Sequence, residues 1–197
     1  MVLKFKHPPN SNIGRYLNTN KTFYENDLLE DSKKYLFKDA VVLDVGANIG
    51  NHSVYWGSLG CKVHSFEPNE KAVEFLRKNL DLNNVNYKIY NCALSNQSGT
   101  CELVETMDLG ECQIKENAGK IPMYRLDMFG LKPRLLKIDV EGMEYDVLMG
   151  AYFTIRNWHP VIYVEIKNNP CTFDQYLRQF NYVRLEKFGY TPTYKYI

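Results

Sequence analysis

The stretch that decides the fold is Val41-Val42-Leu43-Asp44-Val45-Gly46-Ala47-Asn48-Ile49-Gly50-Asn51-His52. Its first five residues are apolar or β-branched apart from Asp44, which is typical of a buried parallel strand. Gly46 and Gly50 lack a Cβ, so the backbone can turn sharply and approach a ligand closely. The residues from Gly50 to about Ser58 can start a helix whose free N–H groups face that ligand. The segment therefore predicts the first half of a nucleoside-binding unit.

A second acid follows at the place where such a unit needs one. The apolar run 62–66 ends at Glu67, roughly 20 residues beyond Asp44, where a Rossmann-like unit places the carboxylate that binds ribose hydroxyls. A dinucleotide fingerprint from Gly46 would need glycines where the chain has Asn48 and Asn51, and no Gly-Lys-Ser/Thr follows the turn. Asp44 would also repel a pyrophosphate. These features favour a cationic cofactor without phosphate, such as S-adenosylmethionine.

Composition limits the partners and the compartment. The 197 residues include 24 Lys and Arg against 23 Asp and Glu, for a formal net charge of +1. This balance gives no broad basic surface for nucleic acid or an anionic membrane. No apolar run is long enough to span a bilayer or to form a signal peptide, and the five cysteines show no zinc or Cys-x-x-Cys spacing. We therefore expect a cytoplasmic protein with mostly reduced cysteines, no membrane span and no nucleic-acid partner.

The order of the predicted elements indicates one α/β domain. Residues 1–21 are predicted to be an irregular N-terminal lead-in, and residues 22–197 a single domain. The spacing from Thr22 to Glu25 is that of a capping box, although Glu25 could instead contact the cofactor. The stretch 105–120 has no periodicity and is predicted to be a loop. Alternating strands and helices predict a Rossmann-like, doubly wound, mostly parallel seven-stranded sheet with a C-terminal antiparallel hairpin. Strands are predicted near 41–45, 62–66, 87–91, 135–139, 161–166, 182–187 and 193–197, with a further short strand near 101–104.

Three more acids are expected at the ligand-binding edge of this sheet. Asp139 and Glu165 end two predicted strands, and Glu141 follows in the loop after Asp139. Ligands bind at the carboxyl ends of parallel strands, so these side chains could form a divalent-metal site or a base with its positioning partners. On a strand, residues two apart would share a face only through a turn after Asp139, and no Asp-x-Asp cluster adds oxygen ligands. We therefore expect a base and no bound metal.

Several segments, in this order, resemble the FkbM-type methyltransferases of class I: 44–52, 66–69, 136–144, 150–151 and 164–165. The block Lys-Ile-Asp-Val-Glu-Gly at 137–142 is specific to this resemblance, whereas most class I methyltransferases share the glycine turn. The resemblance implies a Rossmann-like sheet and S-adenosylmethionine-dependent O-methylation, often of sugar hydroxyls in glycans or natural products. One departure concerns adenine recognition, because many class I enzymes have an Asp where this chain has Asn91-Cys92-Ala93.

Together these features predict an S-adenosylmethionine-dependent O-methyltransferase acting on a hydroxyl of a sugar or glycan precursor. The candidate bases are Asp139, Glu141 and His52, although His52 could equally be a structural histidine at the start of a helix. A nucleic-acid methyltransferase is one alternative, although it would need an Asn/Asp-Pro-Pro-aromatic or Pro-Cys motif after the fourth strand, where the chain has Asp139-Val140-Glu141-Gly142. Another small-molecule methyltransferase and a non-catalytic adenosine-binding module are the remaining alternatives. The expected cofactor contacts are Asp44, Gly46, Ala47, Asn48, Gly50, Asn51, Glu67, Pro68, Asn91, Cys92, Ala93 and Asp139.

Overall fold

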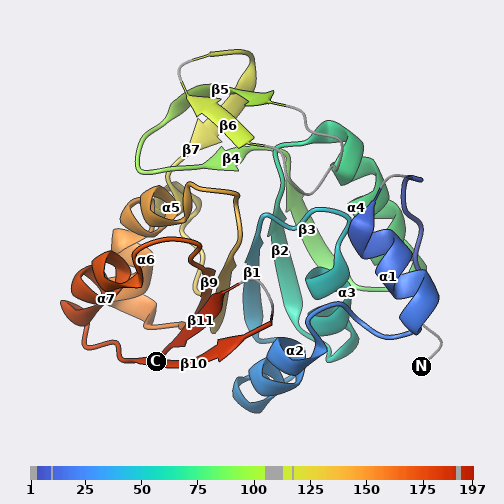
Figure 1. Ribbon diagram of the computed structural model, residues 1–197, viewed down its shortest axis with the longest axis horizontal. Coiled ribbons are helices and arrows are strands. Elements are labelled where there is room, and N and C mark those ends of the chain that lie inside the picture. Colours follow the sequence, from blue (N-terminus) through green and yellow to red (C-terminus); the bar gives the residue numbers. More distant parts are fainter. Residues whose placement is uncertain (1–3, 10, 105–112, 117, 190–191) are drawn as a thin grey trace.

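A seven-stranded sheet forms the centre of the protein (Figure 1). The structure, a computed structural model, describes residues 4–9, 11–104, 113–116, 118–189 and 192–197. From β9 to β3 the neighbouring strands are parallel, whereas the last two strands of the chain form an antiparallel hairpin at the other edge. This topology confirms the predicted fold class. The strands lie in the order β10 (Arg184–Phe188), β11 (Thr193–Tyr196), β9 (Val161–Glu165), β8 (Leu135–Ile138), β1 (Val41–Val45), β2 (Lys62–Phe66) and β3 (Asn86–Tyr90).

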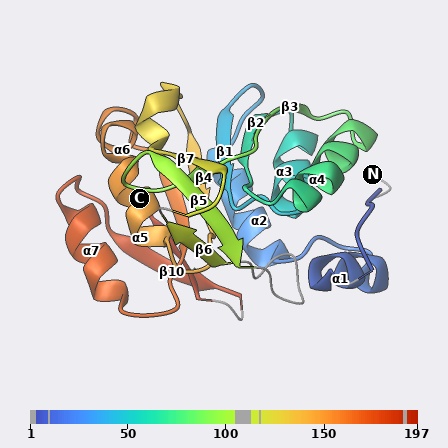
Figure 2. The ribbon, with the colours of Figure 1, turned by 90° about the horizontal axis from the view of Figure 1, so that it is seen from above.

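Helices cover both faces of this sheet, as Figures 1 and 2 show from two directions. Along β1, Val42 packs with the helices of one face, while Leu43 and Val45 pack with those of the other. This alternation follows from the two-residue period of a strand, and burial on both faces explains why the strand is almost wholly apolar. The first face carries α2 (Asn26–Ser32), α3 (Asn51–Ser58) and α4 (Glu70–Leu82), and the second carries α5 (Glu144–Gly150), α6 (Tyr152–Trp158) and α7 (Pro170–Arg178).

A second, four-stranded sheet was not predicted. It continues from the carboxyl end of β3 and has the order β4 (Ala93–Leu94), β7 (Ile121–Tyr124), β5 (Gly99–Val104) and β6 (Gln113–Glu116) (Figure 1). The prediction of a loop over 105–120 is wrong for β6, which pairs antiparallel with β5. The four residues of β6 are too few for an alternation of apolar and polar side chains to be recognised in the sequence. They form a strand because they pair with β5. Residues 105–112 and 117, which belong to the same predicted loop, lie outside the described residues.

The N-terminal segment is more regular than its composition indicated. Residues 12–20 form helix α1 (Asn12–Asn20), so the prediction of an irregular lead-in over 1–21 is wrong there. The Ser11 hydroxyl caps this helix by accepting a hydrogen bond from the Gly14 N–H (3.0 Å), and Leu17 is buried. The helix was missed because most of its residues are polar and its only aliphatic side chains are those of Ile13 and Leu17.

Two asparagine side chains attach the N-terminal segment to the sheet domain. The Asn79 side chain accepts from the Lys6 N–H (2.6 Å) and donates to the Lys6 carbonyl (2.9 Å). The Asn51 side chain likewise accepts from the Tyr24 N–H and donates to the Tyr24 carbonyl, both at 3.0 Å. Each amide therefore replaces one step of a strand pairing and fixes the register of the bound segment.

The short helices, the lengths of the helices and the state of the cysteines complete the description of the fold. Two 3₁₀ helices, η1 (Lys33–Tyr35) and η2 (Leu126–Phe129), connect larger elements. In the described part of the chain, no helix has the length and apolar character to cross a membrane. The described cysteines, Cys61, Cys92, Cys101 and Cys171, are all free.

Candidate active site

The loop after β1 owes its shape to residues with positive φ angles. Gly46 (φ 80°), Asn48 (φ 48°) and Gly50 (φ 93°) lie in the left-handed region that side chains disfavour. A Cβ on Gly46 would lie 1.7 Å from the backbone oxygen of Asp139, so the loop and the end of β8 approach too closely for any side chain. A Cβ on Gly50 would instead meet Leu76, at 2.8 Å. Gly46 thus allows a close approach at the site, and Gly50 allows α3 to begin.

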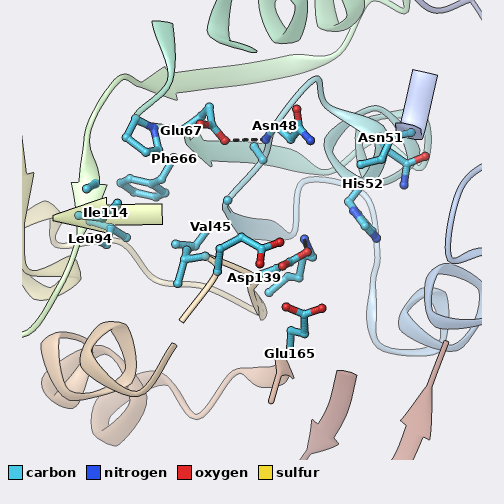
Figure 3. Close-up of a pocket in the computed structure, with 18 of the residues that line it drawn as sticks. Val45, Asn48, Asn51, His52, Phe66, Glu67, Leu94, Ile114, Asp139 and Glu165 are labelled. Carbon is cyan, nitrogen blue, oxygen red and sulfur yellow. Dashed lines mark hydrogen bonds and ion pairs between the residues drawn. The ribbon is translucent and has the colours of Figure 1, made fainter. Parts of the chain in front are cut away.

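Glu67 closes the loop from the neighbouring strand. It follows β2 directly, and its two carboxylate oxygens accept hydrogen bonds from the N–H groups of Asn48 (2.8 Å; Figure 3) and Asn69 (2.9 Å). Burial raises the pKa of Glu67 to about 7, with a smaller contribution from Asp44, against the two N–H donors that lower it. A ligand hydroxyl that reached this carboxylate would therefore meet an oriented acceptor.

A cavity of about 630 Å³ opens at the carboxyl ends of the parallel strands. This volume is within the usual range for a small-molecule site. Figure 3 shows an apolar end with Phe66, Leu94 and Ile114, and a polar end toward His52 and Glu165. The expected site residues that line the cavity are Gly46, Ala47, Asn48, Asn51, His52, Glu67, Pro68, Cys92, Ala93, Asp139 and Glu141.

Three residues expected to contact the cofactor, Asp44, Gly50 and Asn91, do not line the cavity. Asp44 is fully buried behind the loop, where it accepts a hydrogen bond from the Ser53 hydroxyl (2.5 Å). The alternation of β1 turns its side chain toward α3. Gly50 faces Leu76, as described above. The Asn91 side chain donates to the backbone oxygens of Glu67 (2.9 Å) and Pro68 (3.1 Å), so it supports the loop after β2.

The acids at the sheet edge do come together. Asp139 follows β8, Glu165 ends β9, and a positive φ of 59° at Glu141 bends the chain after Asp139. One carboxylate oxygen from each of the three residues lies within 4.8 Å of the others. The turn required to bring Asp139 and Glu141 to one face is therefore present.

Two lysines balance this cluster of acids. The Lys137 ammonium lies 2.9 Å from Asp139, and Lys167 pairs with Glu141 and lies 3.4 Å from Glu165. Burial opposes ionisation of Asp139, but Lys137 holds the pKa of Asp139 below its usual range. Burial and the Asp139 charge raise the pKa of Glu165 to about 7. At neutral pH, Asp139 is therefore an ionised and weakly basic carboxylate.

His52 lies opposite these acids with a carboxylate of its own. Its Nε2 is 3.0 Å from an oxygen of Glu25, and both side chains are buried. Glu25 has a φ of 53° and makes no capping hydrogen bond to α2, which begins at Asn26 instead of at Thr22. The capping-box prediction is therefore wrong, and the Glu25 side chain lies on the cavity wall.

Comparison with known proteins identifies the family. Residues 44–192 match the sequence model of the FkbM methyltransferase domain. The chain belongs to the FkbM methyltransferase family. This family agrees with the sequence prediction of a methyltransferase domain that uses S-adenosylmethionine as its cofactor. A search of curated proteins found no match.

Solved structures support the fold of this FkbM-family chain. A methyltransferase FkbM from Methylobacillus flagellatus KT aligns with a TM-score of 0.61 and 17% identity, over 81% of this chain but 43% of its own. The chain thus spans less than half the length of that protein. A ribosomal protein L11 methylase from Lactobacillus delbrueckii subsp. bulgaricus aligns with a TM-score of 0.58, 12% identity and coverages of 89% and 80%. An rRNA methylase from Streptococcus thermophilus aligns at 0.52, with 16% identity and coverages of 87% and 90%.

The cavity of the FkbM domain fits its cofactor. The side-chain oxygen of Asn48 is buried and has no hydrogen-bond partner among the described residues, so a ligand donor would satisfy it. Gly46 leaves room beside it for a close approach. Glu67 offers acceptor oxygens on the same side, and Phe66 gives an apolar surface.

Several residues of the site were missed by sequence reasoning. Lys137 was interpreted as part of an apolar strand, although a lysine within a buried run requires a nearby acid. In the pairing of β8 with β1, Lys137 lies opposite Asp44, and its ammonium is 3.9 Å from a carboxylate oxygen of Asp44. Apart from Glu25, which the sequence offered as a possible cofactor contact, the N-terminal wall carried no sequence signal, because only tertiary packing brings it to the cavity. This wall consists of Asn12, Ile13, Tyr16, Tyr24 and Glu25.

Proposed function

We propose that this protein transfers the methyl group of S-adenosylmethionine to a hydroxyl of a sugar or glycan precursor. The observation that carries the proposal is one continuous cavity with two unlike ends. The end near Glu67 offers ribose acceptors and apolar walls, and the opposite end offers carboxylates and an imidazole. An acceptor hydroxyl bound at the second end would lie between the methyl donor and a group that accepts its proton.

We infer how the first end would hold the cofactor. Glu67 would accept hydrogen bonds from the ribose hydroxyls, as in other Rossmann-like units. The loop from Gly46 to Asn48 would hold the methionine part, with Asp139 near its positive charge. Pro68, Cys92 and Ala93 would contact adenine, together with Phe66 and Leu94.

The chemistry needs little from the protein beyond orientation and proton removal. The bound cofactor supplies a methyl group already activated by the sulfonium. The cavity walls would align the acceptor hydroxyl and exclude water, which are orientation effects. Asp139, Glu141 and His52 are the groups placed to take the hydroxyl proton.

The second end has surfaces suited to a cyclic, polyhydroxylated acceptor. The Tyr16 and Tyr24 rings meet edge to face, with centroids 5.3 Å apart at 84°. Each ring offers an apolar face and a hydroxyl, which suits the apolar and polar sides of a sugar. Asn12 adds an amide beside them. This combination supports the sugar hydroxyl as the acceptor.

The alternatives predict different acceptors. The fold similarity to RNA methylases extends to fold alone, and the charge balance of the chain gives no footprint for RNA. A non-catalytic module would bind cofactor without turnover.

We propose the cytoplasm as the compartment of this protein. The described cysteines are all free, which agrees with a reducing compartment.

Incubation with methyl-labelled S-adenosylmethionine tests the proposed function. We expect label to enter the hydroxyls of nucleotide sugars or glycan precursors, and to do so with a chelator present, because Lys137 and Lys167 already balance the acids. Total RNA and heat-treated protein serve as the comparison arms. Label in RNA alone, turnover that needs added magnesium, or no turnover with any hydroxyl acceptor would each contradict the corresponding part of the proposal.

Replacing Glu67 tests the cofactor assignment. We expect Glu67→Ala to raise the dissociation constants of S-adenosylmethionine and of its demethylated product by about tenfold or more, because each lost bond to a charged acceptor is worth roughly 1.5–3 kcal/mol. Titration calorimetry measures both constants. Glu70→Ala, which changes an exposed acid at the start of α4, is the matched control. Unchanged affinity in a folded Glu67→Ala protein would rule the assignment out.

A further inference from the structure

Glu25 and His52 form a buried pair that joins two distant segments of the chain. The carboxylate oxygen of Glu25 lies 3.0 Å from Nε2 of His52, and the two side chains are only 6% and 7% exposed. Both residues line the cavity. Burying a carboxylate is costly unless a cation or a donor offsets it, and His52 supplies that offset when its ring carries a proton on Nε2.

Hydrogen bonds between the preceding residues bring this pair together. The Asn51 side chain binds both the N–H and the carbonyl of Tyr24, so that Glu25, which follows Tyr24, lies beside His52, which follows Asn51. Glu25 itself keeps a left-handed φ of 53°, a conformation that is strained for a residue other than glycine. Such strain is maintained when the surrounding contacts fix the residue, and it is common at functional sites.

The other candidate bases are engaged by lysines. Asp139 is paired with Lys137 at 2.9 Å, which lowers its pKa and its basicity. Glu141 is paired with Lys167. Glu165 has a pKa of about 7 but is 3% exposed and also lies beside Lys167. By contrast, the ion pair of His52 in the described part of the chain is with a carboxylate, that of Glu25, and not with a lysine.

On this geometry we propose that Glu25 is a positioning residue that holds His52 as the acceptor of the substrate proton. The proposal rests on the proposed function. In the step, the acceptor oxygen forms a bond to the methyl carbon as the carbon–sulfur bond breaks, and that electron pair stays on sulfur. The hydroxyl proton passes to Nδ1 of His52, and the resulting imidazolium faces the Glu25 carboxylate. Proton and charge are thereby both accounted for.

The charges around the pair support these roles. Burial opposes ionisation of Glu25, but His52 and Lys137 hold its pKa below the usual range, so Glu25 is a carboxylate at neutral pH. Asp139 faces the same space, and His52 adds to the effect of Lys137 in holding the pKa of Asp139 below its usual range. Trp56 packs against the ring of His52, with centroids 5.6 Å apart, and limits its rotation.

The tautomer of His52 tests the pairing without any acceptor. Nitrogen-15 NMR of labelled protein reports which ring nitrogen carries the proton in the neutral form. We expect Nε2–H in the wild type and a mixture of tautomers in Glu25→Gln, because an amide can donate to Nε2 as well as accept from it. Glu30→Gln, at a side chain of α2 that is 55% exposed, should leave the tautomer unchanged. An unchanged tautomer in Glu25→Gln would overturn the pairing.

Kinetics then test whether the pair takes the proton. With an acceptor identified by the labelling assay, we expect His52→Ala to lower kcat by about 10²-fold or more and Glu25→Gln by about tenfold or more, within the range of a positioned base. The cofactor dissociation constant should stay within about twofold, which separates this role from a cofactor contact. Full kcat in a folded Glu25→Gln protein would overturn the role of Glu25. Loss of activity in Glu165→Gln together with full activity in His52→Ala would show that an acid of the cluster, and not His52, accepts the substrate proton. Absence of hydroxyl methylation by the wild type would contradict the proposed function, whereas the tautomer experiment stands apart from that result.

Discussion

Replacing Lys137 with methionine should lower the free energy of unfolding by about 3–5 kcal/mol, the usual cost of removing one partner from a buried ion pair. The Lys137 side chain is 2% exposed, and its ammonium lies 2.9 Å from Asp139 and 3.9 Å from Asp44. Burial opposes its charge, but Asp139, Asp44 and Glu25 keep the pKa of Lys137 above its usual value. Methionine fills similar space and leaves the acids uncompensated. Urea unfolding measures the loss.

A surface lysine provides the control for this experiment. Lys62→Met removes a lysine whose side chain is 47% exposed and which pairs with Asp39 at 3.3 Å. We expect a change within about 0.5 kcal/mol, as for most exposed substitutions. If the Lys137→Met protein were as stable as the wild type, the neighbouring acids, Asp44 and Asp139, would have to lose their charge by taking up protons. The Asp139 carboxylate would then not be ionised in the folded variant.

Asp139→Asn should weaken cofactor binding more than any other change at the acidic edge. A carboxylate near the positive charge of S-adenosylmethionine is worth roughly 1.5–3 kcal/mol, so the dissociation constant should rise about tenfold to 100-fold. The demethylated product lacks the sulfonium, so its affinity should fall less. Titration calorimetry with both ligands separates the two effects.

Glu141→Gln is the matched comparison for this charge. Glu141 lies one bend beyond Asp139 and already pairs with Lys167, so its loss should change the cofactor affinity less. Equal losses in the two variants would mean that the cluster acts through its total charge. A wild-type affinity in folded Asp139→Asn would exclude Asp139 as a cofactor contact.

The sequence predicts the main sheet because its central strands are apolar on both faces. Val41–Val45 and Leu135–Ile138 are recognisable for this reason, and the acids after them are expected to meet because parallel strands share a carboxyl edge. The convergence of Asp139, Glu141 and Glu165 follows from this rule and from one turn. These parts of the site could be predicted from strand ends alone.

Other parts depend on contacts between distant segments. The four residues of β6 form a strand because β5 lies beside them, and α1 forms a cavity wall because Asn79 and Asn51 hold its flanks. The side chain of Asp44 points behind the loop because of its position in the strand period, which a motif match does not state. Lys137 was hidden within an apolar run that its charge should have interrupted.

The attachment of the N-terminal segment by two amide side chains has a consequence for how acceptor choice can change. The segment up to Glu25 precedes the region 44–192 that matches the family, yet it forms the wall opposite the cofactor loop. These hydrogen bonds of Asn51 and Asn79 are to main-chain atoms of the segment and do not depend on its side chains. Substitutions at Asn12 or Tyr16 can therefore change the side chains of this wall while both asparagines still bind the segment. The side chains of this wall can thus vary without loss of the two main-chain attachments that hold it.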